Sequence, residues 1–121
     1  MNEAISDDSK NQSPLTIRQA QDQIDHWIQT IGVRYFDEMT NLAQLVEEVG
    51  EVARILSRTR GEQSWEKTET PGDLGDELAD VLFVTMCLAN QSGIDMTEAF
   101  RRNLDKKTNR DAKRHLENEK L

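Results

Sequence analysis

Residues 72–91 constrain the fold most, because this segment is apolar on nearly every side and yet carries acidic side chains on its apolar face. The run 81–89 has the all-round hydrophobicity of a buried helix. On a helical wheel, Glu77 and Asp80 both fall within the apolar arc. Ionised carboxylates in such a setting are costly unless they are paired or bind a metal. The segment therefore predicts a buried helix whose carboxylates are paired or bind a metal.

A second acidic pair, Glu48 and Glu51, lies on the helix expected before this one. Residues three apart share a helix face, with Cβ atoms about 5–6 Å apart. If the two helices pack together, Glu48, Glu51, Glu77 and Asp80 converge. Hard oxygen ligands of this kind suit Mg²⁺, with Mn²⁺ as a substitute. The spacing predicts a metal site suited to chemistry on phosphates. A purely solvated acidic face is the alternative.

The periodicity predicts an all-α chain, a bundle of about four helices with no strand pattern. Capping boxes at Thr16–Gln19 and Asp95–Glu98 mark two of the helix starts. Residues 1–13 are polar and aperiodic, which predicts a disordered tail before a single domain at 14–121. The expected helices span residues 17–31, 37–60, 72–91 and 97–116.

Composition limits the core and the partners. With 36% hydrophobic and 5% aromatic residues in 121, one chain is short of core, and oligomerisation is the natural remedy. The formal net charge of −8 argues against binding a nucleic acid polymer. The lone Cys87 is expected to pack inside, as is Trp27 on the apolar stripe of the first helix.

The cysteine content and the distribution of apolar residues indicate the cellular compartment. A single cysteine allows no intramolecular disulfide, which fits a reducing cytoplasm. No apolar run reaches the length of a membrane span, and the polar N-terminus does not resemble a secretory signal. We therefore expect a cytoplasmic protein with no membrane partner.

The last helix reverses the charge. Seven basic residues face only two acidic ones in residues 101–114. Asn103, Lys106 and Arg110 share one helix face, with Lys107 beside it. The alternative is a solvated basic face; next to a metal site, the face is a candidate clamp for phosphates. Trp65, in the polar loop 61–71, is a candidate for stacking on a base.

The string Glu47-Glu48-Val49-Gly50-Glu51, followed by Glu77-Leu78-Ala79-Asp80, resembles the MazG-like nucleoside triphosphate pyrophosphohydrolases, whose pattern is ExxE, a spacer, then ExxD. The stretch Asn103-x-x-Lys106-Lys107-x-x-Arg110 is similar to the phosphate-binding stretch of that family. The resemblance covers about residues 15–115.

The resemblance implies an all-α fold completed as a homodimer or homotetramer, and Mg²⁺-dependent hydrolysis of an NTP or dNTP to the monophosphate and pyrophosphate. It implies that Glu48, Glu51, Glu77 and Asp80 are metal ligands, and that Glu47 orients or deprotonates the attacking water. Base-recognition residues vary across the family, so the resemblance does not name the base.

Three other classes compete. A phosphoribosyl-ATP pyrophosphohydrolase would share the metal site. A ferritin-like dimetal protein would need Glu-x-x-His, and neither His26 nor His115 sits three residues after a glutamate. A non-catalytic helical adaptor would carry the same acids as ordinary surface charge, and Mg²⁺ would not stabilise it.

Overall fold

The computed structural model describes residues 13–121, and within them the protein is built from helices with no strand. The helices are α2 (Ile17–Thr30), α3 (Glu38–Thr59), α4 (Leu74–Gln91) and α5 (Met96–Leu116). The predicted all-α class is confirmed, and each predicted helix agrees with an observed one to within a few residues. The predicted tail lies outside the described residues except for Ser13.

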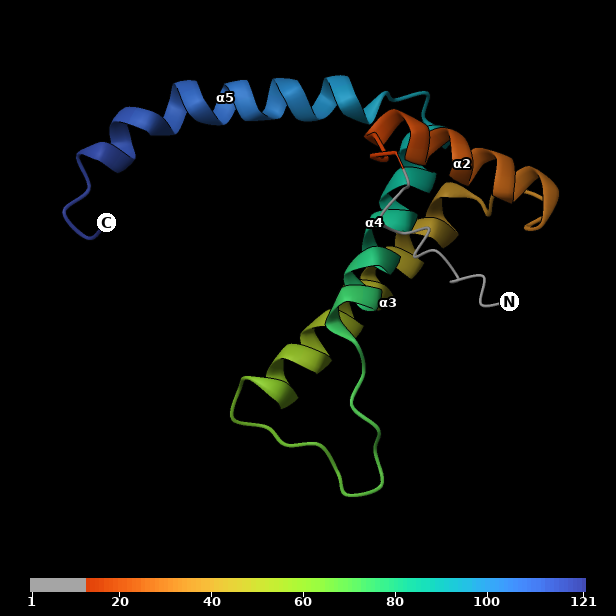
Figure 1. Cartoon of the computed structure of the whole chain (residues 1–121), viewed down its shortest axis with the longest axis horizontal. Coiled ribbons are helices and arrows are strands. Elements are labelled where there is room, and N and C mark those ends of the chain that lie inside the picture. Colours follow the sequence, from red (N-terminus) through yellow and green to blue (C-terminus); the bar gives the residue numbers. More distant parts are fainter. Residues whose placement is uncertain (1–12) are drawn as a thin grey trace, which may run out of the picture.

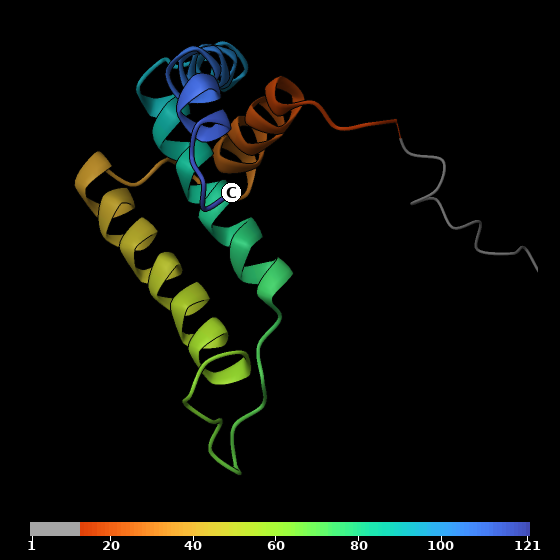
Figure 2. The ribbon, with the colours of Figure 1, turned by 90° about the vertical axis from the view of Figure 1, so that its left-hand side faces the viewer.

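α3 and α4 form a long antiparallel pair joined by the loop 60–73 (Figure 1). Their contact is the most extensive between any two helices. α2 packs across the end of α4, and α5 leaves that same end and runs away from the pair (Figures 1 and 2). The pair α3–α4 is therefore open along much of its length.

The helix starts follow the sequence signals to different degrees. The box at Thr16 closes in both directions, since Thr16 Oγ1 accepts from the Gln19 N–H at 3.1 Å and Gln19 Oε1 accepts from the Thr16 N–H at 2.9 Å. At α5, Asp95 accepts from the Thr97 N–H at 2.9 Å. Glu98 pairs instead with Arg101 at 3.0 Å, so this second box forms only in half.

α2 ends at Thr30, and Gly32 and Val33 lie in the turn that follows. Val33, not Gly32, has the positive φ of 74°. A Cβ at Gly32 would lie 3.2 Å from both the Ile28 Cα and the Trp27 ring. The glycine is needed for close approach, and the conformational strain falls on an exposed valine.

The core of one chain is small. It comprises Ile28, Ile55, Val84, Met86, Cys87 and Ala89. Cys87 packs inside, as predicted. Trp27 is not enclosed as predicted: it is 45% exposed, although its ring packs against Phe83 of α4. α4 is less enclosed than predicted, since Leu78 and Leu82 are 51% and 55% exposed.

None of the helices described is both long enough and apolar enough to cross a bilayer.

Candidate active site

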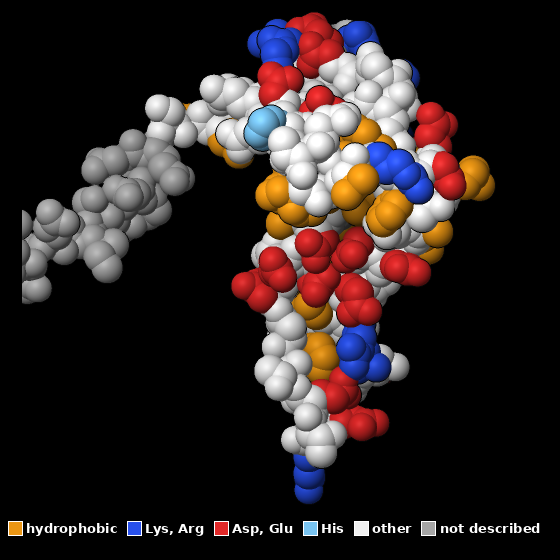
Figure 3. All heavy atoms as spheres, turned by 90° about the vertical axis from the view of Figure 1, so that its right-hand side faces the viewer, with side chains coloured by type: hydrophobic (Ala, Val, Ile, Leu, Met, Phe, Trp, Pro, Cys, Tyr) orange, Lys and Arg blue, Asp and Glu red, His pale blue; other side chains and the backbone are white. Residues whose placement is uncertain are grey.

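Three carboxylates from two helices meet halfway along the α3–α4 pair. Glu48 of α3 and Glu77 and Asp80 of α4 each offer an oxygen within 4.8 Å of the others. All three residues are half-buried. Figure 3 shows the acidic side chains gathered as one patch on a face of the molecule. We call Glu48, Glu77 and Asp80 the acidic triad.

Helix packing produces this convergence. α4 begins at Asp73, whose side chain accepts from the Gly75 N–H at 2.8 Å, so Glu77 and Asp80 lie in its first two turns. α3 runs antiparallel and brings Glu48 alongside. Ile55 of α3 is buried, and its side chain contacts the backbone near Gly72, which holds the loop-end of the pair together.

The charges within the triad oppose one another. Partial burial raises the pKa of Glu48, and the negative charge of Asp80 raises it further. The pKa of Glu77 is raised by the same two causes in the same order, with Glu48 contributing next. Carboxyl groups whose charged forms are mutually unfavourable are prepared to accept a cation.

Two further acids of α3 stand at the edge of the acidic triad. Glu51 is exposed and lies outside the group of converging oxygens, but its charge helps to raise the pKa of both Glu48 and Glu77. Glu47 is also exposed, and its charge helps to raise the pKa of Glu48. The structure thus gathers three of the four predicted ligands and places Glu51 nearby.

An apolar pocket of about 240 Å³ adjoins the acidic triad. Gln44 lies one helical turn from Glu48, and Val84 one turn from Asp80, so the pocket continues the groove between α3 and α4. The rings of Trp27 and Phe83 pack edge to face, with their centroids 5.8 Å apart and their planes at 86°. The lining residues include Trp27, Tyr35, Phe36, Asn41, Gln44, Phe83, Val84 and Cys87. We call this the aromatic pocket.

Trp65 lies in the loop after α3, and the guanidinium groups of two arginines of α3 lie over its ring. Arg54 and Arg58 lie over the ring at 5.5 and 5.8 Å from its centroid. The indole N–H donates to Thr59 Oγ1 at 3.4 Å. Base stacking by Trp65 stays a prediction.

The basic residues of α5 lie away from the acidic triad of their own chain. Every residue from 101 to 110 is exposed, and α5 packs mainly against α2. Asn103 and Lys106 line a shallow hollow on the α5 surface. Arg110 is occupied by Asp111, to which its Nε and Nη2 donate at 2.8 and 2.7 Å. Lys107 is exposed alongside.

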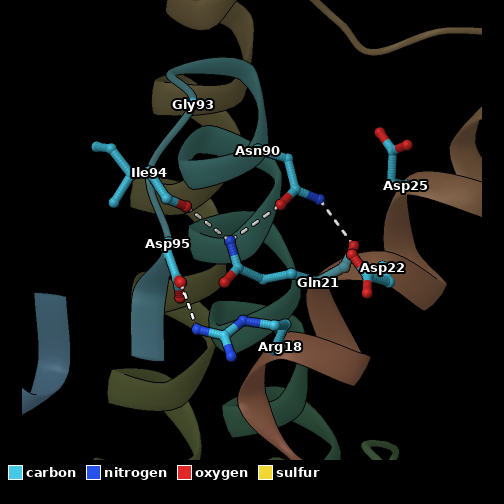
Figure 4. Close-up of a pocket in the computed structure, with 8 residues that line it drawn as sticks. All are labelled: Arg18, Gln21, Asp22, Asp25, Asn90, Gly93, Ile94 and Asp95. Atoms are coloured by element: carbon cyan, nitrogen blue, oxygen red, sulfur yellow. Dashed lines mark hydrogen bonds and ion pairs between the residues drawn. The ribbon is translucent and has the colours of Figure 1, made fainter. Parts of the chain in front are cut away.

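A polar hollow of about 420 Å³ marks the junction of α2, α4 and α5 (Figure 4). The side-chain amide of the buried Gln21 donates to Asn90 Oδ1 at 3.0 Å and to the Ile94 carbonyl at 2.9 Å, and its oxygen Oε1 accepts from the Met96 N–H at 2.9 Å. Arg18 pairs with Asp95 at 2.5 Å. The hydrogen-bonding groups of Gln21 and Asn90 are paired with one another and with the backbone. We therefore interpret the hollow as the packing contact of α2, α4 and α5 and not as a second active site.

The chain is similar to nucleotide hydrolases of known fold. The family model described as the MazG nucleotide pyrophosphohydrolase domain matches residues 36–115. YpjD of Bacillus subtilis (strain 168) is 36% identical over 102 residues, covering 84% of this chain and 92% of YpjD.

Two crystal structures share the fold. That of YpjD from Bacillus subtilis superposes with a TM-score of 0.69 at 36% identity, covering 78% of this chain and 97% of that one. The Bacillus-conserved MazG protein, a nucleotide pyrophosphohydrolase, superposes with a TM-score of 0.65 at 30% identity, covering 78% and 91%. The chain belongs to the MazG nucleotide pyrophosphohydrolase family, and it is a pyrophosphohydrolase of the all-α type.

Sequence reasoning missed the aromatic pocket and the two arginines over Trp65. The pocket is assembled from three segments around Trp27, Tyr35 and Phe83, which no local pattern connects. The arginines left a signal: Arg54 and Arg58 follow Glu51 by three and seven residues, the spacing of one helix face.

Proposed function

We propose that the protein is a Mg²⁺-dependent nucleoside triphosphate pyrophosphohydrolase that converts an NTP or dNTP and water into the monophosphate and pyrophosphate. The observation that carries the proposal is the acidic triad, whose oxygens converge within 4.8 Å on the fold of this family. Hydrolysis of a surplus or damaged nucleotide is the role that such a reaction would serve.

The acidic triad fits a hard divalent cation. All its donors are carboxylate oxygens, and the raised pKa values of Glu48 and Glu77 reflect charges that a cation would neutralise. Glu51 is placed to complete the set as a fourth ligand. When bound, Mg²⁺ or Mn²⁺ supplies Lewis-acid neutralisation of the phosphate oxygens and promotes ionisation of water.

The remaining chemistry is assigned to side chains of this chain. Water adds to a phosphorus of the anhydride between the α- and β-phosphates, the bond from that phosphorus to the bridging oxygen breaks, and pyrophosphate separates from the monophosphate. Glu47, exposed beside Glu48, accepts the proton of the attacking water.

The aromatic pocket is assigned to the nucleoside. Its walls are mainly apolar and aromatic, and two of its lining residues, Gln44 and Val84, lie one helical turn from Glu48 and Asp80. An aromatic slot stacks a base of any kind, and the Gln44 amide can read its edge. Trp65 stays a second candidate for stacking, from the loop side of the acidic triad.

A panel of the common NTPs and dNTPs, with released pyrophosphate measured with and without Mg²⁺, tests the proposal. Hydrolysis of at least one nucleotide that requires the metal is expected. Phosphoribosyl-ATP belongs in the same panel, since turnover of that compound alone would favour the related pyrophosphohydrolase. An adaptor would hydrolyse nothing and gain no thermal stability from Mg²⁺.

We also propose that the enzyme is a homo-oligomer, a dimer or a dimer of dimers. α3 presents an apolar seam to solvent with the 3-4 spacing of helices that pair side by side. Val46 at its centre is 65% exposed. The seam comprises Met39, Leu42, Val46, Val49, Ala53 and Leu56, all exposed in one chain. A second copy of this chain is the occupant, because the small core needs the added burial.

The basic face of α5 is assigned to the active site of that second copy. α5 projects away from the α3–α4 pair of its own chain, and with it the four residues of the basic face, Asn103, Lys106, Lys107 and Arg110 (Figure 1). A helix that extends 21 residues beyond the α3–α4 pair can reach across an interface. The lysines and arginines then hold the phosphates by charge-assisted bonds.

Mixing two inactive variants tests this assignment. One variant carries Asp80→Asn and the other carries Lys106→Ala with Arg110→Ala. In a mixed oligomer, one active site combines intact carboxylates with an intact α5, so activity returns. If mixing after subunit exchange restores no activity, the basic face does not act across the interface.

The cytoplasmic location remains a prediction from the sequence, resting on the single cysteine, which is buried.

A further inference from the structure

We propose that Arg54 and Arg58, positioned by Trp65, form the binding site for the β- and γ-phosphates, the part of the substrate that leaves as pyrophosphate. This inference rests on the proposed pyrophosphohydrolase function and adds to it a cationic subsite on the same chain as the carboxylates. We call the three residues the arginine clamp.

Helix geometry places the arginine clamp in line with Glu47 and Glu51, the two acids at the edge of the acidic triad. Glu47, Glu51, Arg54 and Arg58 are spaced by four, three and four residues, so they fall within an arc of about 60° on α3. Along the axis, Arg54 lies about 4.5 Å and Arg58 about 10.5 Å beyond Glu51. A phosphate chain that starts at the acidic triad and runs toward the loop would meet the two guanidinium groups in turn.

The surface shows the same order. In Figure 3, side chains of Lys or Arg lie on the same face as the acidic patch, immediately beyond it toward the loop end. α4 carries no basic residue, so within residues 13–121 the cations of this face come from α3 and the loop. The seam of α3 lies on the opposite side of the helix, which leaves the arginine clamp accessible in the proposed dimer.

The two guanidinium groups are held in place before any ligand binds. Trp65 lies beneath both of them, at 5.5 and 5.8 Å, a distance at which cation–π attraction operates. Arg54 also pairs with Glu69, whose other oxygen accepts from the Glu66 N–H at 3.1 Å. The loop thus fixes the arginines, and the entropy cost of ordering two long side chains is met in the folded protein.

The Arg58 guanidinium is available to pair with an anionic ligand. Across residues 13–121 it forms no ion pair, whereas the neighbouring Arg54 does. It is half-buried against Trp65, so its charge is less screened than that of a fully exposed arginine. Guanidinium groups match phosphate oxygens in a bidentate geometry. A polyphosphate is the anion that two adjacent arginines beside a metal site fit best.

The alternative is that the cluster only fastens the loop to α3. That role predicts lower thermal stability when a member is removed, with no selective loss of affinity for polyphosphate. The comparison of pyrophosphate with a nucleoside monophosphate therefore separates the two roles, because the monophosphate does not extend to the arginine clamp.

The experiment measures binding of inorganic pyrophosphate and of nucleoside monophosphates by calorimetry in Mg²⁺, using the full chain. Arg58→Gln should weaken pyrophosphate binding about tenfold or more, the size expected for a lost charge-assisted bond. Monophosphate binding should change less than about twofold. Arg58→Lys keeps the charge without the fork and should recover part of the loss.

Two further variants complete the series. Arg101→Gln is the matched control, since this exposed arginine pairs with Glu98 on α5, away from the basic face and from α3, and should leave both affinities unchanged. Trp65→Leu should lower the affinity for pyrophosphate relative to monophosphate through misplaced arginines, a selective effect that loop loosening alone would not produce.

Equal pyrophosphate affinities in Arg58→Gln and the wild type would overturn the arginine clamp, as would a loss that is the same for both ligands. The outcome is separable from that of the proposed function, because pyrophosphate binding in Mg²⁺ is measured without turnover. A protein that hydrolyses no nucleotide yet loses pyrophosphate selectively in Arg58→Gln would refute the function and keep the anion site.

Discussion

α4 and α5 follow each other in the chain, but α4 is packed among the other helices and α5 is exposed to solvent. α4 holds four buried residues and two acids of the acidic triad, and it contacts both α2 and α3. α5 holds no buried residue and carries the basic face into solvent. The first helix is specified by contacts within one chain. The basic face of α5 lies away from the α3–α4 pair of its own chain. We therefore assign it to the active site of a second copy in the oligomer.

Substitution of a carboxylate on α4 should have the largest effect. Asp80→Asn is expected to lower kcat/KM by at least about 100-fold, the order seen when one charge-stabilising group of an active site is removed. The folded apo protein should be retained, because like-charge repulsion falls. Pyrophosphate release measures kcat/KM, and circular dichroism shows whether the apo protein is folded. Asp105→Asn on exposed α5 is the control, and an equal loss there would remove the distinction between the helices.

The α3 seam comes next. Val46→Asp places a charge in the proposed interface and should shift the oligomer to monomers at micromolar concentration, since an unpaired buried charge is strongly unfavourable. Light scattering gives the mass. Val33→Asp introduces the same charge at a valine that is exposed in the turn and should change nothing. A wild-type protein that is an active monomer would contradict the whole assignment of α5.

The basic face of α5 should show an intermediate effect. Lys106→Ala and Arg110→Ala are each expected to raise KM for the nucleotide and lower kcat/KM about tenfold, from the loss of one charge-assisted bond. Lys113→Ala, further along the helix and 84% exposed, should do little. Steady-state kinetics on the best nucleotide decide this. Equal, negligible effects at the three positions would make α5 a solvated surface.

The attachment of α5 depends on hydrogen bonds, which gives a smaller prediction. Gln21→Leu removes the amide that bonds Asn90, Ile94 and Met96, and should lower the free energy of unfolding by about 1–3 kcal/mol through the groups left unsatisfied. Chemical denaturation measures it. Gln23→Leu, at an exposed position of the same helix, is the control.

The smallest effect concerns pH. The pKa values of Glu48 and Glu77 are raised above the ordinary 4.5, so the folded protein holds these protons more tightly than the unfolded chain. Stability of the metal-free protein should therefore fall as pH rises from about that value through the raised pKa values. Glu77→Gln should unfold at a higher temperature than the wild type, by a margin that widens over this window.

Subtracting the variant from the wild type isolates this effect. The pKa values of Asp37, Asp95 and Asp111 are lowered below 3.8, and their contributions are lost as pH falls, in both proteins alike. Adding Mg²⁺ should stabilise the wild type at neutral pH and much less at low pH, where the carboxyl groups are protonated. A margin that narrows with rising pH would contradict the repulsion within the acidic triad.

The sequence by itself determined the helices and the acidic pairs. Capping residues such as Thr16 and Asp73 act within one turn, and the spacing of Glu77 and Asp80 is fixed by the helix that carries them. Both are local properties, which periodicity reports directly. That is why the all-α class and the positions of the helices followed from the sequence, whereas the packing of α3 against α4 entered it only as a condition.

Only the tertiary structure decided which side chains meet. The register of α3 against α4 joins Glu48 to Glu77 and Asp80 and leaves Glu51 at the edge. The fold alone brings Trp27, Tyr35 and Phe83 to one pocket, and sets Trp65 under Arg54 and Arg58. The basic face of α5 was a candidate clamp for phosphates beside the metal site, and the structure carries it away from the α3–α4 pair of its own chain (Figure 1). Contacts between distant segments depend on packing, and packing leaves no local period in a sequence.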